Sequence, residues 1–305
     1  MNQVERSRGC LLGLAVGDAL GTTLEFRSPG SFTPIQDMVG GGPFSLSPGE
    51  WTDDTSMALC LAESLINCQG MDLADQMQRY VRWYREGYLS STGACFDIGN
   101  TVRSALVNFE KTGNPRSGST DPYSAGNGSI MRLAPVPMYF ADDLTASIRN
   151  SAKSSLTTHG TRTAVDACRY FGALITGALN GVAKSDLLSD EYFADEDPLT
   201  EEIEQIARGS FKEKQTPDIK GTGYVVQSLE AALWAFDRSD SFESGCLMAV
   251  NLGDDADTTG AVFGQIAGAY YGEAAIPISW VSKIAFKDLI RSFADQIYSL
   301  AKCFN

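Results

Sequence analysis

Long apolar stretches with helical spacing are the feature that most restricts the fold of this chain. Apolar residues fall on one helix face at Leu73, Met77, Tyr80, Val81 and Tyr84. Alternating patterns with β-branched residues, which are typical of half-buried strands, are scarce. Further helical stretches are residues 57–66, 164–182, 225–236, 261–271 and 289–300. We therefore predict an all-α fold.

No composition shift, internal repeat or linker marks a domain boundary. A length of 305 residues, with 43% hydrophobic residues, is sufficient for a sizeable core. We predict that residues 1–305 form a single compact multi-helix domain.

Many glycines fall inside the predicted helices, although each costs about 1 kcal/mol relative to Ala in a helix interior. Close approach of helix to helix explains such glycines, because a side chain would keep the backbones apart. We expect this contact at Gly13, Gly17, Gly21, Gly172, Gly177, Gly264 and Gly268.

Three segments interrupt the helical pattern. Residues 28–48 and 112–128 are rich in Gly and Pro, and loops of this length in a compact domain are often functional. Residues 186–197 are acidic, and we predict a solvated surface there.

The charge balance excludes several functions. With 24 Lys and Arg against 38 Asp and Glu, the formal net charge is −14. Direct nucleic-acid binding and association with an anionic membrane are not expected, because both need a basic face. No apolar run is long enough to cross a membrane.

The single histidine restricts the chemistry further. Zinc sites with two or three His ligands are impossible within one chain, and a Ser–His or Cys–His pair would have to use His159. We therefore expect carboxylates to carry the chemistry. The seven cysteines are scattered, odd in number and without a CxxC pair, which indicates a reducing cytoplasm.

Two acidic segments each precede an apolar helical stretch, at residues 51–55 and 253–259. Read singly, each is a helix start with Thr52 or a carboxylate as cap. Read together, they would bring at least four carboxylates into one cleft if both helix starts face it. Such a group needs a counter-cation, and oxygen ligands without His or Cys select Mg²⁺, Mn²⁺ or Ca²⁺. The number of carboxylates suits two ions.

Three further segments could take part in a site. Asp18 and Glu25 are two helical turns apart, so one helix could hold both on one face. The loop at residues 126–132, Gly-Asn-Gly-Ser-Ile-Met-Arg, could bind an anion through its backbone N–H groups or be a simple turn. His159 precedes a predicted helix and could be a hydrogen-bonded cap.

Together these segments resemble the ADP-ribosylglycohydrolase family, which includes the dinitrogenase-reductase-activating glycohydrolases. The matching stretches run in order along nearly the whole chain. They are GCLLGLAVGDALGTTLEF (9–26), WTDDTSMAL (51–59), GNGSIMRLAPV (126–136), THGTRTA (158–164), GTGYVVQSLEAALWAF (221–236) and NLGDDADTTGAVFGQIAGAYYG (251–272).

The resemblance implies an all-α fold with a dinuclear Mg²⁺ or Mn²⁺ centre at the bottom of a cleft. Glu25 matches the glutamate that acts near the scissile bond. By the same resemblance Asp257 is both a metal ligand and a catalytic residue. The metal ligands implied are Thr52, Asp53, Asp54, Asp255, Asp257 and Thr258.

Substrate-binding residues are also implied by the resemblance. Gly126, Asn127, Gly128 and Ser129 match the loop that holds the diphosphate. Asp97, with Asn100 nearby, matches a position that faces the guanidinium in arginine-directed members. His159 matches a position near the adenine or its ribose, and Tyr224 one that borders ADP-ribose. Asp254 departs from the family pattern, in which we expect a glycine.

The implied reaction is metal-dependent hydrolysis that removes ADP-ribose from an ADP-ribosylated protein. An acidic cleft suits the cationic guanidinium, which favours arginine over serine as the modified residue. Alternatives are hydrolysis of ADP-ribosylserine or of a small ADP-ribose derivative, a metal-dependent phosphohydrolase, and a non-catalytic ADP-ribose-binding or structural protein on the same fold.

Overall fold

A computed structural model describes residues 2–303 and has the predicted all-α architecture. Within these residues, β pairing is limited to three isolated bridges, and three short 3₁₀ turns accompany the helices. The helices are α1 (Gln3–Gly21), α2 (Asp53–Cys68), α3 (Leu73–Glu86), α4 (Asn100–Thr112), α5 (Pro135–Tyr139), α6 (Leu144–Ser155), α7 (Arg162–Leu179), α8 (Lys184–Leu187), α9 (Glu201–Ala207), α10 (Ser210–Glu213), α11 (Val225–Arg238), α12 (Phe242–Val250), α13 (Ala256–Tyr271), α14 (Ile278–Val281) and α15 (Lys287–Cys303).

The central feature is the antiparallel packing of α1 against α13. α1 is buried on all sides from Gly9 to Gly21, as expected of a helix that is apolar all round. Its glycines lie directly on the α13 backbone, and a Cβ on Gly13 or Gly17 would overlap with a carbonyl group of α13. The contacts are Gly9 with Gly268, Gly13 with Gly264, Gly17 with Gly260, and Gly21 with Ala256. The predicted close approach of helices is confirmed at Gly13, Gly17, Gly21, Gly264 and Gly268, and Gly172 lies against Ser151 of α6. Gly177 differs, because it leaves room for the side chain of Tyr192, which lies outside the helices.

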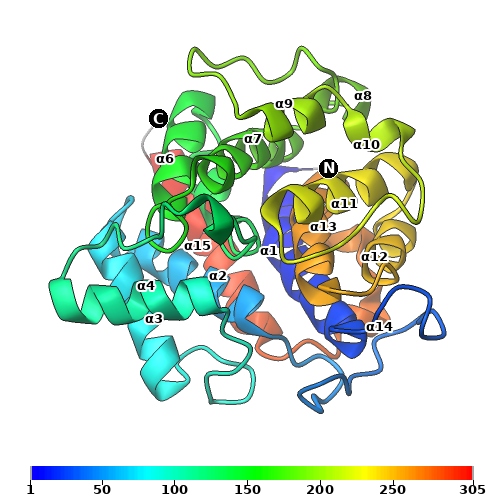
Figure 1. Cartoon of the computed structure of the whole chain (residues 1–305), viewed down its shortest axis with the longest axis horizontal. Helices are drawn as coiled ribbons and strands as arrows, with labels where there is room; N and C mark the ends of the chain where they lie inside the picture. The colour runs from blue at the N-terminus through cyan, green and yellow to red at the C-terminus, as the bar shows by residue number, and fades with distance from the viewer. Residues whose placement is uncertain (1, 304–305) are drawn as a thin grey trace.

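The other helices surround this pair. Figure 1 shows α1 and α13 side by side at the centre, with α2, α3 and α4 to one side and α11 and α12 to the other. α15 packs on α1 and α2, and α7 packs on α6 and α13. The buried apolar residues of these helices form one continuous core.

The amphipathic face of α3 differs slightly from the expected one. Its buried residues are Gln76, Met77, Tyr80 and Trp83, whereas Val81 and Tyr84 are only partly buried. Gln76 lies on the buried face because its amide donates to Tyr80 Oη at 3.0 Å and to Ser154 Oγ at 3.1 Å.

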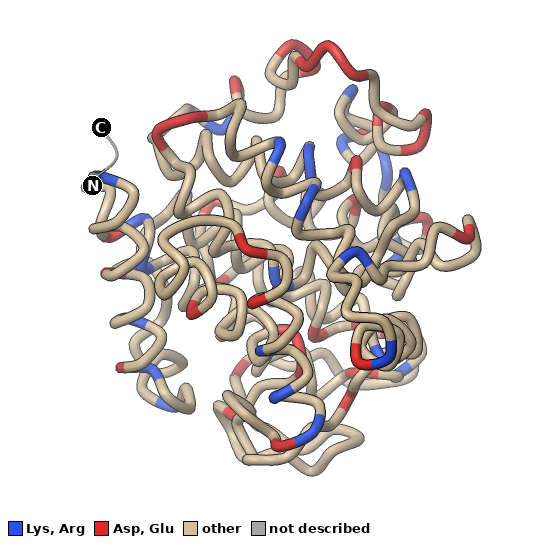
Figure 2. The backbone as a smooth tube through the Cα atoms, turned by 90° about the vertical axis from the view of Figure 1, so that its left-hand side faces the viewer, with Lys and Arg blue, Asp and Glu red and all other residues tan. Residues whose placement is uncertain are grey.

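The acidic segment 186–197 is solvated as predicted, because all its Asp and Glu residues are exposed, although two of its apolar residues are buried. Leu187 and Leu188 are buried, and Asp197 pairs with Arg162 at 2.8 Å. The apolar residues anchor the segment, whereas its acidic residues, near the top of Figure 2, are exposed to solvent.

Two further expectations concern location. Among the described residues, no helix combines the length and the apolar character that crossing a membrane requires. Cys10, Cys60, Cys168 and Cys246 are buried free thiols, in agreement with their interpretation as small hydrophobic residues, and Cys95 and Cys68 are free but more exposed. The side chain of Cys303 lies outside the described part of the chain.

The Gly17→Ala variant tests the α1–α13 contact. The added methyl group meets backbone atoms of Gly260 and Ala261, which cannot rotate away. We expect the free energy of unfolding to fall by about 3 kcal/mol or more, measured by thermal or denaturant unfolding. Gly99→Ala is the control, because Gly99 has φ −63° and nothing within 4 Å of an added Cβ. Equal stability of the two variants would contradict the close contact.

Candidate active site

A cleft of about 660 Å³ opens beside the start of α13. Acidic residues line its floor, glycines line one wall, and no Lys or Arg lines it within residues 2–303. The polar lining residues from the predicted set are Glu25, Asp53, Asp97, Asn100, Asn127, His159, Asp255 and Thr258.

The starts of α2 and α13 meet at the floor of this cleft. Thr52 Oγ1 lies 3.2 Å from Asp257 Oδ2, and Thr258 Oγ1 donates to Asp54 Oδ2 at 3.3 Å. Residues about 200 positions apart in the sequence are therefore in direct contact. The condition left open by the sequence, that both acidic segments face one site, is fulfilled.

The capping interpretation of these segments is right about position but wrong about the hydrogen bond. Thr52 and Asp255 occupy the N-cap positions of α2 and α13, but neither side chain makes a capping hydrogen bond. Asp18 of α1 binds the start of α2 instead. Its carboxylate accepts from the backbone N–H and the hydroxyl of both Thr52 and Thr55, at 2.6–3.0 Å. The other acidic side chains are thus free for another role.

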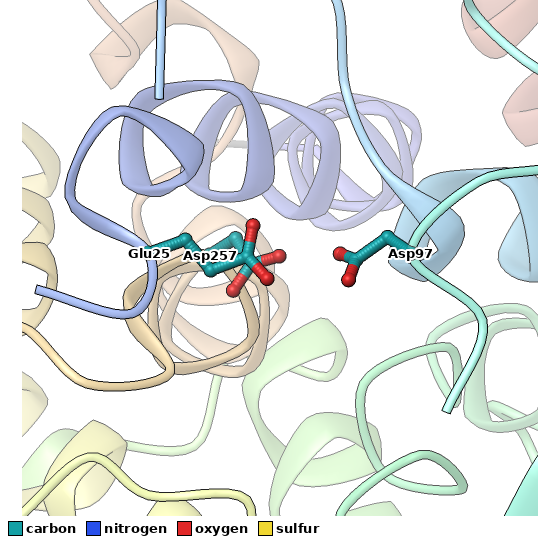
Figure 3. A group of neighbouring side chains, drawn as sticks. All are labelled: Glu25, Asp97 and Asp257. Atoms are coloured by element: carbon teal, nitrogen blue, oxygen red, sulfur yellow. The ribbon is translucent and has the colours of Figure 1, made fainter. Parts of the chain in front are cut away.

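Glu25 does not share a helix with Asp18. α1 ends at Gly21, a 3₁₀ turn follows at Thr22–Leu24, and Glu25 comes directly after that turn. The turn directs the Glu25 carboxylate to the α13 start. Oxygens of Glu25, Asp97 and Asp257 lie within 4.8 Å of one another. Figure 3 shows the Asp97 carboxylate facing those of Glu25 and Asp257.

Burial and mutual repulsion dominate the electrostatics of the floor. Burial, with Asp97 and Asp255 close by, raises the pKa of Glu25 to about 10. Burial also raises the pKa of Asp97 to about 7 and the pKa values of Asp53, Asp54 and Asp257 well above their usual range. These groups cannot all be ionised near neutral pH without a counter-cation.

The atoms of the floor fit divalent cations. Glu25 Oε2, Asp54 Oδ1 and Asp257 Oδ1 are buried and have no hydrogen-bond partner in the described part of the chain, which is costly unless a ligand satisfies them. Every atom that could coordinate a cation there is an oxygen, and oxygen ligands favour hard cations. Thr52, Asp53, Asp54, Asp255, Asp257 and Thr258 all lie around this point.

The loop at residues 125–128 forms the opposite wall. Asn127 donates to Asp255 Oδ2 at 2.7 Å, and its backbone N–H donates to the carbonyl of Gly223 at 3.1 Å. Gly126 and Gly128 line the cleft, but the Ser129 side chain does not. Ser129 is buried, and its hydroxyl oxygen lies 3.4 Å from Cys168 Sγ.

Three other residues predicted to bind substrate, Tyr224, His159 and Asn100, lie in or beside the cleft. Tyr224 borders an adjoining pocket of about 470 Å³ rather than the main cleft, and its hydroxyl donates to Glu202 at 2.7 Å. His159 lines the cleft but does not cap α7, because Thr161 is the N-cap and accepts from Ala164 N–H. Asn100, the first residue of α4, is exposed at the rim.

The position of Asp254 explains why glycine is expected there. Asp254 has φ +53°, in the left-handed region that favours glycine, and Phe26 opposite it has φ +59°. Two backbone hydrogen bonds link these segments, from Phe26 N–H to the Asp254 carbonyl at 2.7 Å and from Asp254 N–H to the Arg27 carbonyl at 2.8 Å. This link keeps Glu25 next to the α13 start despite the strained backbone.

Asp18 and Arg132 lie in segments that the sequence marked as candidates, but the sequence assigned neither residue a role. Asp18 interrupts the apolar run of α1, and a carboxylate in such a run needs hydrogen-bond partners. Arg132 is completely buried in the segment after the Gly126–Gly128 loop, and it donates to Thr158 Oγ1 at 2.7 Å. In both cases the available signal was a charged residue inside an apolar stretch.

Known proteins resemble this chain along almost its whole length. The sequence profile described as ADP-ribosylglycohydrolase matches residues 1–303. The chain is 43% identical over 298 residues to "ADP-ribosylarginine hydrolase Tri1" of Serratia proteamaculans (strain 568), and the match covers 98% of this chain and 80% of that protein. The protein of the same name from Pseudomonas putida (strain GB-1) is 45% identical, with coverage of 98% and 79%. A solved "ADP-ribosylglycohydrolase-related protein complex" has a TM-score of 0.88 at 42% identity and covers 98% of this chain and 99% of that one.

The raised carboxyl pKa values predict an unusual pH dependence of stability. Asp18, with a pKa of about 6, and Asp97, with a pKa of about 7, bind protons more tightly in the folded than in the unfolded chain. In EDTA, the free energy of unfolding should therefore fall as the pH rises from about 5 to about 8. Denaturant unfolding at each pH measures this fall, and a rise over that interval would contradict it.

The same measurement in Mn²⁺ or Mg²⁺ tests the cation site. A cation at 100 times its Kd should add about 2.7 kcal/mol and flatten the pH dependence, because it replaces the protons. Asp257→Asn should lose this gain, whereas the exposed Asp190→Asn should keep it.

Proposed function

The chain belongs to the ADP-ribosylglycohydrolase family, and on this premise we propose that it hydrolyses the N-glycosidic bond between ADP-ribose and arginine in modified proteins. The observation that carries the proposal is the convergence of Glu25, Asp97 and Asp257 at the floor of a cleft without Lys or Arg. Relatives 43% and 45% identical bear the name ADP-ribosylarginine hydrolase, which supports the same linkage. The products would be free ADP-ribose and the unmodified arginine.

We propose two divalent cations, Mg²⁺ or Mn²⁺, as cofactors. Thr52, Asp53 and Asp54 from the start of α2 would hold them together with Asp255, Asp257 and Thr258 from the start of α13. The buried oxygens of Asp54 and Asp257 that have no partner support this assignment. When bound, the cations would supply orientation of the ribose hydroxyl groups and a lower pKa for a water molecule.

Glu25 is the proposed proton-transfer group. Its carboxylate lines the cleft beside Asp97 and Asp257, and Oε2 has no hydrogen-bond partner among residues 2–303. The bond breaks through an oxocarbenium-like transition state, so a group that moves a proton to the leaving guanidine or from the attacking water lowers the barrier. Asp257, at the floor of the cleft, would take part in this chemistry as a ligand of the cations.

Asp97 is the proposed recognition group for arginine. It precedes α4, has φ +58° and is only partly buried, so its carboxylate stands between the floor and the rim. A guanidinium enters this acidic environment with favourable electrostatics, whereas the neutral serine hydroxyl gains much less. Asn100 lies at the same rim.

The direct test is release of ADP-ribose from an arginine-ADP-ribosylated protein in Mg²⁺, in Mn²⁺ and in EDTA. We expect release of intact ADP-ribose with either metal ion and none in EDTA. Serine-linked protein runs in parallel and should react far more slowly. Release from serine alone would overturn the assignment of Asp97, and release of phosphate or AMP would indicate a phosphohydrolase. Binding of ADP-ribose without any release would favour a non-catalytic protein.

Glu25→Gln tests the proton-transfer group separately. The amide keeps the shape of the side chain but cannot exchange a proton, so kcat should fall about 100- to 10,000-fold. Binding of ADP-ribose, measured by calorimetry, should change little. Glu50→Gln is the control, since Glu50 only accepts from Ser47 N–H at 2.7 Å and does not line the cleft. Wild-type turnover in Glu25→Gln would remove Glu25 from this role.

A further inference from the structure

The proposed substrate poses an electrostatic problem for this cleft. ADP-ribose has an anionic diphosphate, yet no Lys or Arg within residues 2–303 lines the cleft and its floor is acidic. Neutral donors must therefore bind the diphosphate. The backbone N–H groups of Gly128 and Ser129 are available, because neither donates to another described residue.

His159 stands directly against this loop. A Cβ on Gly126 would lie 3.3 Å from His159 Nε2, and one on Gly128 would lie 2.8 Å from its Cε1. The two glycines thus leave the space that the imidazole ring occupies. Nε2 has no hydrogen-bond partner among the described residues, although the ring is 2% exposed and lines the cleft.

The other ring nitrogen is part of a hydrogen-bonded chain. Arg132 Nη2 lies 2.7 Å from Thr158 Oγ1, which lies 2.9 Å from His159 Nδ1. A guanidinium can only donate, so the Thr158 oxygen accepts from Arg132. The single hydroxyl hydrogen then has one acceptor within reach, which is Nδ1. If Nδ1 carried the proton instead, the buried hydroxyl hydrogen would lack a partner.

Arg132 fixes the direction in which these hydrogen bonds are donated, from Arg132 to Thr158 and from Thr158 to His159. It is completely buried, and among the described residues it forms no salt bridge with a carboxylate. Its other contacts are the Thr157 hydroxyl at 3.2 Å, the Met57 sulfur at 3.6 Å and the Tyr80 ring at 4.6 Å from its centre. Its positive charge disfavours a second cation nearby, and burial with Arg132 lowers the pKa of His159 to about 3.

We propose that Arg132 and Thr158 hold His159 in the tautomer with the proton on Nε2, so that this N–H joins those of Gly128 and Ser129 in binding the diphosphate of ADP-ribose. The inference rests on the proposed function for the identity of the ligand. His159 is a binding residue here and does not transfer protons, whereas Arg132 and Thr158 are positioning residues that act through it. The uncompensated charge of Arg132 adds an attractive field behind the wall.

The single histidine makes the tautomer measurable. In protein labelled with ¹⁵N-histidine, His159 contributes the only imidazole signals. We expect a protonated Nε2 and an unprotonated Nδ1 in the free protein, unchanged from about pH 5 to about pH 8. A protonated Nδ1, or titration of the ring in this interval, would overturn the proposal. Neither result depends on catalytic activity, so failure of the proposed hydrolysis would be recognised separately.

Thr158→Val removes the hydroxyl at nearly constant volume. It should abolish the single tautomer, raise the Kd for ADP-ribose about 10- to 100-fold, and raise KM while kcat changes little, because the diphosphate is remote from the bond that breaks. Thr158→Ser should restore the wild-type signals and affinity. Thr157→Val is the matched control, since it also removes a hydroxyl from Arg132 but does not touch His159. Unchanged signals and affinity in Thr158→Val would overturn the positioning role.

A second pair of variants keeps the test decisive if Thr158→Val does not fold. The side-chain amide nitrogen of Gln reaches about as far as Nε2 of histidine, and that of Asn about as far as Nδ1. His159→Gln should therefore stay within a few-fold of the wild-type Kd for ADP-ribose, and His159→Asn should bind at least 10-fold more weakly. Equal affinities of the two variants would contradict a donor at Nε2.

Discussion

The direct contact between the backbones of α1 and α13 is the interaction on which the rest of the structure depends. Four glycine positions of α1 meet Gly268, Gly264, Gly260 and Ala256 at intervals of one helical turn. This register brings the end of α1 to the start of α13, so that Asp18 and Asp257 approach the same threonine, Thr52. The glycines therefore position carboxylates as well as pack helices.

The proposed function requires the cleft to bind cations at its floor and an anionic diphosphate at its wall. Among the described residues, no basic side chain lines the cleft. Its floor gathers carboxylates that repel one another and whose raised pKa values reflect burial without compensating charge. Its wall offers N–H groups and a neutral imidazole ring. Arg132, whose positive charge lies behind this wall, is completely buried. A basic side chain in the cleft would pair with the floor carboxylates and weaken a cation site, so this distribution serves both tasks.

Local chemistry made part of this arrangement predictable. The apolar spacing predicted the helices, and the residue types at 51–55 and 253–259 indicated a cation site. Whether the two segments meet depends on long-range packing, which periodicity does not encode. The same limit applies to Glu25, which a 3₁₀ turn separates from α1, and to Thr52, whose capping role Asp18 takes over. Tyr224 came from resemblance alone, and its hydroxyl is bound to Glu202.

The α1–α13 pairing also has a consequence for how the chain is made. α1 is buried on all sides from Gly9 to Gly21, but residues 22–255 separate it in the sequence from α13, the helix that covers it most closely. On the ribosome, the apolar surface of α1 stays uncovered until α13 has emerged, and an uncovered apolar surface favours aggregation. The central helix pair therefore forms only after α13 has been synthesised, late relative to the synthesis of α1.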